Sequence, residues 1–240
     1  MKVLDLFSGI GGFSLGLERA GHETVAFCEF DKKAQLVLKK HWPELPIYDD
    51  VKTLTKEILE NDGINEIDII CGGFPCQDIS YAGKGAGLEG ERSGLWFEFH
   101  RLIKEIQPKY AVIENVAALR SRGLDEVLGS LAEIGYDAEW HCIPASAVGA
   151  PHRRDRVWIV ANTTSIGLQG QGEFEQSKHT AQIINGEAIK SQYGCIASFW
   201  KVEPNVCRVA DGVSGRVDRL KQLGNAVVPQ IPELIGRALI

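Results

Sequence analysis

The chain has 240 residues, 44% of them hydrophobic, and a formal net charge of −6. This length and composition are those of a globular protein with a sizeable core, either one large α/β domain or one and a half ordinary ones. The acidic balance argues mildly against a nucleic-acid partner, because neutralising phosphates requires Lys and Arg. No apolar run reaches the roughly 20 residues of a membrane span and no signal-peptide pattern opens the sequence, so we expect a cytoplasmic protein.

The placement of charges and cysteines refines these limits. Basic residues gather at 153–156 and again between Arg208 and Lys221, which is compatible with a local basic face or with an ordinary solvated surface. The six cysteines are scattered without a CxxC pair, so the pattern predicts reduced thiols and neither a zinc site nor a disulfide framework.

Residues 1–41 alternate between strand and helix patterns. We predict strands over 2–7 and 24–29 and helices over 13–20 and 32–41. The glycine turn at 8–12 would let a ligand approach the backbone, and the helix that follows offers unpaired N–H groups, although the turn is equally compatible with a plain βα connection. Glu29 ends the second strand, where it is either a ribose ligand or a surface acid, and Asp31 suits a helix N-cap.

An acidic turn at residues 48–51 precedes a helical pattern that ends near Gly63. Asp50 in this turn is placed either to accept an adenine amino group or to cap the helix, and the residues leave both interpretations open.

Residues 67–72 predict a buried strand that stops at Gly72-Gly73, and Pro75 then stiffens the loop that carries Cys76. Ligands of open α/β sheets bind just outside the carboxyl ends of the strands, which makes Cys76 a candidate nucleophile. The alternative is an inert core thiol, but the flanking glycines and proline favour reactivity. The glycine-rich residues 83–90 suit either a mobile lid or an ordinary loop.

The α/β alternation continues in the second half of the chain. The patterns predict helices over 95–107 and 125–134 and strands over 110–115, 137–143 and 157–161. Glu114 should emerge at the same sheet edge as Cys76. If the extended conformation begins early, alternation sends Arg154 and Arg156 to one side of the last strand. His152 by itself is more typical of a structural hydrogen bond than of catalysis.

Residues 163 to 198 are polar and show no sustained period, which indicates an inserted loop or small domain. Order resumes at Trp200, and residues 219–229 lead into a final helix through Ala238. We therefore expect a doubly wound, mostly parallel α/β sheet with helices on both faces, closed by a C-terminal helix that returns to the N-terminal lobe.

Several short motifs occur in a fixed order along the chain. They are DLFSGIGGF from Asp5 to Phe13, Glu29, Asp50, GFPCQ from Gly73 to Gln77, ENV from Glu114, RDR from Arg154 and LGNAVV from Leu223. Together they resemble the C5-cytosine-specific DNA methyltransferases, which use S-adenosylmethionine. The resemblance implies a Rossmann-like class I methyltransferase fold, with a catalytic, cofactor-binding domain of residues 1–162 and 205–240 and a short target-recognition insert of residues 163–204.

The resemblance also implies roles for individual residues. Cys76 would be the nucleophile, Glu114 the group at the cytosine N3 edge, and Arg154 and Arg156 the residues that hold the base and its charge. The cofactor contacts implied by position, with Glu29 on the ribose and Asp50 on the adenine amine, are Phe7, Gly9, Ile10, Gly11, Gly12, Phe13, Glu29, Phe30, Asp50, Val51, Pro75, Leu95, Asn225 and Ala226. Two positions depart from the family's pattern: Ile79 stands where Phe is frequent, and His152 where Gln is frequent.

The implied activity is methyl transfer from S-adenosylmethionine to C5 of a cytosine flipped out of double-stranded DNA, through a covalent bond from Cys76 to C6. Residues 83–90 would close over the flipped base. A transfer-RNA cytosine-5 methyltransferase and a catalytically silent DNA-binding regulator of the same fold are the alternatives. A dinucleotide-dependent oxidoreductase rests on the opening strand, turn and helix alone. The expected enzyme is a cytoplasmic monomer. The residues leave its biological setting open between a partner restriction endonuclease system, phage self-protection and an orphan enzyme.

Overall fold

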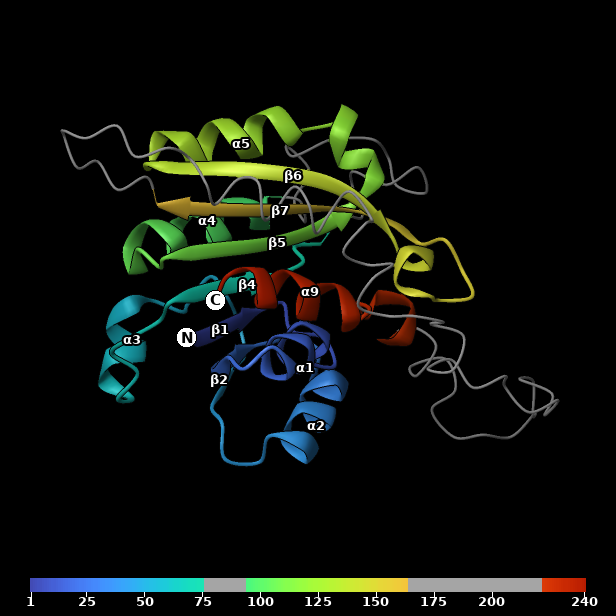
Figure 1. Cartoon of the computed structure of the whole chain (residues 1–240). Helices are drawn as coiled ribbons and strands as arrows, with labels where there is room; N and C mark the ends of the chain where they lie inside the picture. The colour runs from blue at the N-terminus through green and yellow to red at the C-terminus, as the bar shows by residue number, and fades with distance from the viewer. Residues whose placement is uncertain (76–93, 164–221) are drawn as a thin grey trace, which may run out of the picture.

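The computed structural model describes residues 1–75, 94–163 and 222–240, which form a seven-stranded sheet in the order β3-β2-β1-β4-β5-β7-β6 (Figure 1). The strands are β1 (Lys2–Leu6), β2 (Glu23–Cys28), β3 (Ile47–Tyr48), β4 (Ile69–Gly72), β5 (Tyr110–Val116), β6 (Tyr136–Pro144) and β7 (Asp155–Thr163). Strands β1 to β5 pair in parallel, whereas β7 is antiparallel to both of its neighbours. The predicted doubly wound, mostly parallel α/β sheet is confirmed.

Some of the sequence predictions lie outside the described residues. These are Cys76, Ile79, the 83–90 segment, the 163–204 insert from residue 164 onward, and residues 205–221 of the expected catalytic domain with the basic cluster between Arg208 and Lys221. Within the described ranges, no helix is long and apolar enough to cross a bilayer. Cys28, Cys71 and Cys142, the cysteines that these ranges contain, are free thiols.

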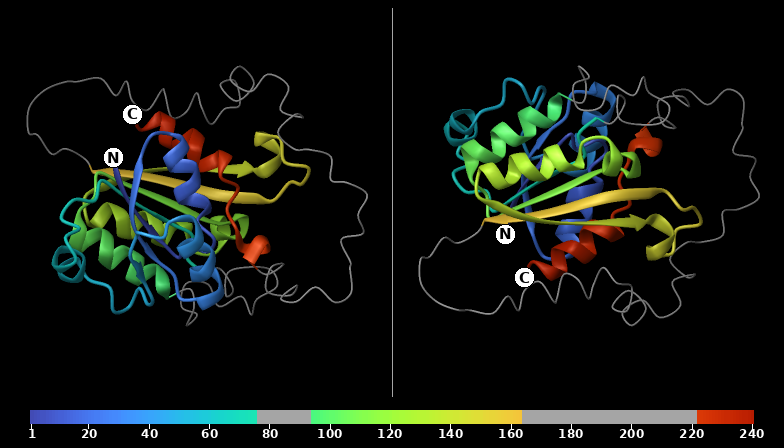
Figure 2. Two further views of the ribbon diagram at one scale, coloured as in Figure 1. Left: turned by 90° about the horizontal axis from the view of Figure 1, so that it is seen from below. Right: turned by 90° about the horizontal axis from the view of Figure 1, so that it is seen from above.

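Helices cover both faces of the sheet (Figure 2). They are α1 (Gly12–Arg19), α2 (Lys32–His41), α3 (Lys56–Asn61), α4 (Leu95–Ile106), α5 (Leu124–Glu133) and α9 (Gln230–Ala238), with short 3₁₀ segments η2 (Ala117–Ser121) and η3 (Ala145–Val148). One apolar core joins the sheet to α3, α4 and α5, and a second joins the opposite face to α1 and α9. This two-layer burial explains why β4 and β5 are apolar at nearly every position.

Glycines let the last helix pack directly on the first. A Cβ built at Gly16 would overlap Pro229 O and lie 2.8 Å from Pro232 Cγ, and one at Gly236 would lie 2.8 Å from Ala20 Cβ. The His22 ring bonds to the same helix, with Nε2 2.9 Å from Gly236 O. The predicted return of the C-terminal helix to the N-terminal lobe is therefore confirmed, and the tight contact explains the small residues on α1 and α9.

The central and C-terminal strands differ slightly from their predicted bounds. We predict a strand over 157–161, whereas β7 extends from Asp155 to Thr163 because it pairs along its whole length with β5 and β6. Conversely, β4 begins at Ile69 rather than at residue 67, since its ladder to β1 starts at the Val3–Ile69 pair.

Candidate functional site

Four parallel strands end at one edge of the sheet and carry the predicted site residues there. Phe7 follows β1, Glu29 follows β2, Gly73 follows β4, and Glu114 lies near the end of β5. The ladder pairs Gly72 with Ile113, so the next residues, Gly73 and Glu114, are neighbours. A Cβ built at Gly73 would lie 2.7 Å from Glu114 Oε2, which places the Glu114 carboxylate beside the turn that leads to Cys76.

The first part of the site is the glycine turn between β1 and α1. Gly9 and Gly11 have φ angles of +54° and +83°, a left-handed conformation that favours glycine. The Ser8 hydroxyl donates to Asp5 O at 2.6 Å, and Gly11 N donates to Ser8 O at 2.9 Å, which closes the turn. Gly11, which precedes α1, has no side chain to cap the helix, and Asp5 accepts from the third amide, Ser14 N, at 3.2 Å. Among the described residues no side chain bonds the N–H groups of Gly12 and Phe13, so these remain available to a ligand.

Glu29 ties this turn to the end of β2. Its Oε2 accepts a hydrogen bond from Gly9 N at 2.7 Å, and its Oε1 accepts one from Asp31 N at 2.6 Å. Burial raises the pKa of Glu29 above its usual range, against these stabilising bonds. Each carboxylate oxygen has two lone pairs, so Glu29 can still accept from ribose hydroxyls. Asp31 caps α2 by accepting from Lys33 N at 2.9 Å, which confirms its N-cap interpretation.

The side chains around the turn divide into open and buried ones. Phe30 is 77% exposed, whereas Phe13 is 3% exposed and packs on Trp158 with ring centroids 5.4 Å apart. Val51 is also buried, and its carbonyl accepts a hydrogen bond from Arg101 at 2.9 Å. The side chains of Phe13 and Val51 are therefore packed in the core, and a ligand at this edge could contact only their main chain.

The remaining predicted cofactor residues of the described ranges are more open. Asp50 accepts from Lys52 N at 3.0 Å within a turn that precedes α3, so it caps that turn and does not cap the helix. The Phe7 ring stacks on Phe99 with centroids 6.2 Å apart. At least partly exposed are Ile10, Pro75, Leu95, Asn225 and Ala226.

The second part of the site is an ion pair between neighbouring strands. Arg156 Nε lies 2.8 Å from Glu114 Oε1, and the side chains are 22% and 13% exposed, respectively. Burial raises the pKa of Glu114 and outweighs the opposing effect of the positive charges of Arg156 and Arg154. Glu114 is thus a carboxyl group that takes up a proton more readily than an exposed glutamate does.

Asn115 supports the same turn, although our sequence analysis gives it no role of its own. Its Nδ2 donates to Phe74 O at 3.2 Å, and its Oδ1 accepts from Val116 N at 2.8 Å. Asn115 and Phe74 are each 2% exposed, and the Phe74 ring packs on Trp96 with centroids 5.4 Å apart. The chain just before Pro75 is therefore fixed from both sides. An amide directly after a strand-ending glutamate was the available sequence signal.

Arg154 is placed differently from the prediction. It has φ 38° and precedes the first residue of β7, so the expected strand alternation does not place it beside Arg156. Its Nη1 donates to Gly224 O at 2.6 Å and its Nη2 to Ala226 O at 2.9 Å. The extended conformation begins only at Asp155, because the preceding loop turns back to bond Arg153 O to Ala145 N.

A buried acid, Asp5, lies beneath the glycine turn. Its Oδ2 accepts from Ser14 N at 3.2 Å and from Ser14 Oγ at 2.7 Å, whereas Oδ1 has no partner among the described residues. Burial raises the pKa of Asp5 from 3.8 to about 7. The only sequence signal for this buried acid is its position inside an apolar strand pattern, so the sequence did not predict it.

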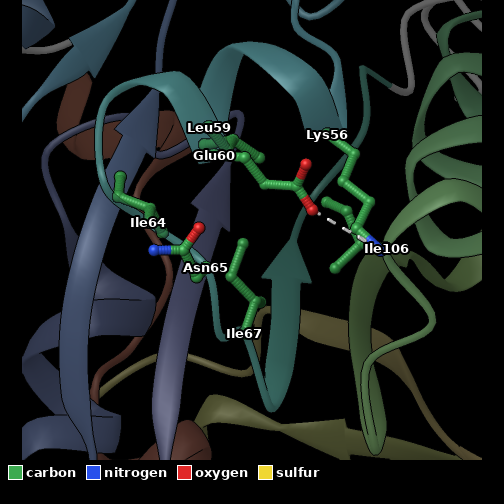
Figure 3. Close-up of a pocket in the computed structure, with 7 residues that line it drawn as sticks. All are labelled: Lys56, Leu59, Glu60, Ile64, Asn65, Ile67 and Ile106. Atoms are coloured by element: carbon green, nitrogen blue, oxygen red, sulfur yellow. Dashed lines mark ion pairs between the residues drawn. The ribbon is translucent and has the colours of Figure 1, made fainter.

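A separate pocket lies at the opposite edge of the sheet (Figure 3). Its lining residues come from α3, from the loop before β4 and from the end of α4: Lys56, Leu59, Glu60, Ile64, Asn65, Ile67 and Ile106. Lys56 Nζ lies 3.8 Å from Glu60 Oε1 across its rim. Because it borders the amino end of β4, this pocket is not part of the site at the carboxyl edge.

The sheet order, the antiparallel β7 and the open glycine turn define a Rossmann-like fold of the class I methyltransferase type. Residues 1–202 match the family model of the C-5 cytosine-specific DNA methylases, and the chain belongs to this family. The resemblance stated from the motifs is confirmed.

Individual relatives agree with this family. The chain is 39% identical over 170 residues to type II methyltransferase M2.BsuMI of Bacillus subtilis, covering 68% of this chain and 42% of that protein. It is 34% identical over 173 residues to type II methyltransferase M.HhaI of Haemophilus parahaemolyticus, covering 70% and 51%. A crystal structure of a prophage-encoded Escherichia coli protein, described as a DNA modification methyltransferase, superimposes with a TM-score of 0.59 at 31% identity, covering 71% and 49%. The chain thus spans about half the length of these relatives.

Proposed function

We propose that the chain is a DNA cytosine-5 methyltransferase that uses S-adenosylmethionine. The observation that carries this proposal is the half-buried Glu114–Arg156 pair, with a 2.8 Å separation, beside Gly73. It stands at the same sheet edge as the glycine turn and Glu29. A dinucleotide-dependent oxidoreductase would use the turn and Glu29 but has no use for this pair.

The residues at the glycine turn fit the proposed cofactor. The turn and the first two amides of α1 offer N–H groups to a carboxylate, Glu29 retains lone pairs for ribose hydroxyls, and the exposed Phe30 ring offers a flat apolar surface for adenine. When bound, S-adenosylmethionine supplies a methyl group on a positively charged sulfur. The chain's own residues hold and orient it.

On the base side, the proposed chemistry starts from the Cys76 thiolate. Its sulfur forms a bond to C6 of the cytosine, and the electron pair of the C5–C6 double bond moves into the ring. Protonation or hydrogen bonding at N3 by Glu114 stabilises this charge, which suits a carboxyl group with a raised pKa. Loss of the C5 proton and departure of sulfur after methylation restore the aromatic ring.

The supporting residues give this chemistry its geometry. Asn115 fixes Phe74 and hence the direction in which the chain continues to Pro75 and Cys76. Arg156 holds the Glu114 carboxyl group and supplies positive charge beside the base. Since C5 and C6 are stacked in a duplex, the cytosine must leave the helix to reach these groups.

The test is covalent trapping on DNA. Duplex DNA containing 5-fluorocytosine lacks the removable C5 proton, so with S-adenosylmethionine it should leave the chain attached to the DNA, as a band that resists denaturation. Cys76→Ser should abolish this band, whereas Cys142→Ser, at an exposed thiol of β6, should not. Absence of the complex from a broad sequence pool would refute the proposal or assign the chain to the silent DNA-binding class.

The transfer-RNA methyltransferase remains the second candidate, because it would use the same catalytic plan. Labelled methyl transfer to transfer RNA but not to duplex DNA would favour it. We further propose residues 1–162 and 205–240 as the catalytic domain, 163–204 as the target-recognition insert and 83–90 as the lid. Double-stranded DNA as substrate, a restriction–modification setting and a cytoplasmic, monomeric enzyme complete the proposal.

A further inference from the structure

The Arg154 guanidinium donates hydrogen bonds to two main-chain carbonyls in the C-terminal part of the chain. Nη1 lies 2.6 Å from Gly224 O and Nη2 lies 2.9 Å from Ala226 O. Residues 222–225 form a helical turn, closed by Ala226 N donating to Gln222 O at 2.9 Å. Carbonyls at the end of a helical turn have no partner within it, and the planar fork of a guanidinium is suited to bond two of them.

The backbone at Arg154 is shaped for this contact. Its φ of 38° is unfavourable for a residue with a Cβ, and such conformations persist only where surrounding contacts fix them. Ala145 N supplies such a contact by donating to Arg153 O at 2.6 Å. The turn therefore sends Arg154 to the C-terminal part of the chain, whereas Arg156, within β7, reaches Glu114.

Residues 222–229, which we call the approach segment, are fixed at their other end by the first helix. Val227 O would lie 2.8 Å from a Cβ built at Gly12, the residue at which the glycine turn passes into α1. Asn225 lies between the two carbonyls that Arg154 bonds, and its side chain is exposed. The approach segment thus runs from Arg154 to the glycine turn with both ends fixed.

We propose that Arg154 is a positioning residue, which fixes the approach segment against the glycine turn so that Asn225 and Ala226 can contact the cofactor. In this arrangement Arg156 pairs directly with Glu114, and Arg154 acts on the base side only through its positive charge. The proposal rests on the proposed function, since the cofactor is what the positioned residues would bind. It replaces the base-holding role expected of Arg154 from the sequence.

The test compares Arg154→Ala and Arg154→Lys with Arg153→Ala, a matched control whose side chain is 83% exposed and pairs with Asp155. Hydrogen exchange of the Ala226 amide in the ligand-free chain measures directly whether Arg154 fixes the approach segment. We expect exchange about tenfold faster in Arg154→Ala, an intermediate rate in Arg154→Lys, and no change in Arg153→Ala. Calorimetric titration with S-adenosylhomocysteine should give a dissociation constant raised about tenfold in Arg154→Ala and partly restored in Arg154→Lys.

Each outcome decides a part of the proposal. An unchanged exchange rate at Ala226 in Arg154→Ala would show that Arg154 does not fix the approach segment. Faster exchange with an unchanged affinity for S-adenosylhomocysteine would overturn the positioning role. A loss confined to DNA binding would assign Arg154 to the base or the phosphates. If the parent chain itself does not bind S-adenosylhomocysteine, the proposed function fails. The exchange rates still show whether Arg154 fixes the approach segment. If Arg154→Ala unfolds, Arg154→Lys provides the same comparison.

Discussion

At the residue scale, Glu114 is subject to two opposing effects. Burial disfavours its charge, and the positive charges of Arg156 and Arg154 favour it; burial is the larger effect, so its pKa is raised. An acid with a raised pKa is suited to give a proton to N3 and to take it back. The 2.8 Å bond to Arg156 at the same time holds the carboxyl group in one orientation.

Glu114→Gln tests the proton-transfer role. Gln keeps the size and hydrogen-bonding capacity of Glu but cannot transfer a proton, so we expect the rate of methyl transfer to fall by about 10² or more. Glu126→Gln, at an exposed position of α5, is the matched control and should leave the rate unchanged. Initial rates with labelled S-adenosylmethionine measure both. A fully active Glu114→Gln would show that the residue only orients the base.

Asp5 makes stability depend on pH. Its pKa rises from 3.8 to about 7 on folding, so the folded chain binds more protons than the unfolded chain between these values. The contribution of Asp5 to the free energy of unfolding is fully present below about pH 4. It is lost as the pH rises to about 7, with a slope of up to about 1.4 kcal/mol per pH unit. Asp5→Asn removes this contribution, so its stability relative to the parent should increase with pH across that window.

Urea denaturation at several pH values measures the Asp5 effect. Asp125→Asn, at an exposed position of α5, is the control and should follow the parent at every pH. If the free energies of unfolding of Asp5→Asn and the parent change with pH in the same way, Asp5 does not take up a proton in the folded chain. The result bears on the site as well, because the Asp5–Ser14 bonds hold the start of α1 beneath the glycine turn.

At the scale of elements, the contact between α1 and α9 closes the fold around the site. Gly16 and Gly236 bring the two helices together, and Val227, just before α9, contacts Gly12 at the start of α1. A helix that packs this closely holds the approach segment at one end, while Arg154 holds the other. The proposed cofactor site therefore depends on elements from both ends of the described chain.

Gly16→Ala tests this contact. The added Cβ would overlap Pro229 O and crowd Pro232, so we expect the free energy of unfolding to fall by about 2 kcal/mol. Gly129→Ala is the matched control in α5, where a Cβ meets nothing within 4 Å. There the better helix propensity of Ala should raise stability by up to about 1 kcal/mol. Urea denaturation distinguishes the two, and a neutral Gly16→Ala would show that α9 can shift away.

At the scale of the whole molecule, parallel pairing places residues from distant parts of the chain at one edge. The glycine turn and Glu29 come from its first strands, Glu114 from β5 and Arg156 from β7. Phe30 adds an exposed ring, 77% accessible, to the cofactor side of this edge. Its exposure makes it dispensable for folding and available for a ligand.

Phe30→Ala should therefore affect binding alone. S-adenosylhomocysteine at 100 times its dissociation constant should stabilise the parent by about 2.7 kcal/mol. Loss of the stacking surface should weaken binding by about tenfold, with the ligand-free melting temperature unchanged. Leu36→Ala, 68% exposed on α2, is the control and should bind as the parent does. Thermal unfolding with and without ligand measures all three, and unchanged binding by Phe30→Ala would remove Phe30 from the site.

Much of the fold was predictable because the relevant signals are local. Apolar runs, glycine turns and helical periods marked most strands and helices to within a few residues, and α2 was predicted with its observed bounds, Lys32–His41. The two-residue strand β3 (Ile47–Tyr48) was not predicted. The parallel order follows from the strand–helix alternation, which also put Glu114 and the Gly73 turn at one edge. The motifs and their order sufficed to assign the family.

Other features depended on contacts between residues far apart in sequence. Arg154 bonds Gly224 and Ala226 because the chain turns at φ 38° and because α9 brings that segment back, and neither fact is written in a local pattern. The same is true of Asn115, whose partner is Phe74 O, and of Asp5, whose pKa depends on burial under α1. Local sequence set the elements and their ends; three-dimensional packing decided which polar groups meet, since burial and hydrogen bonding are properties of the assembled fold.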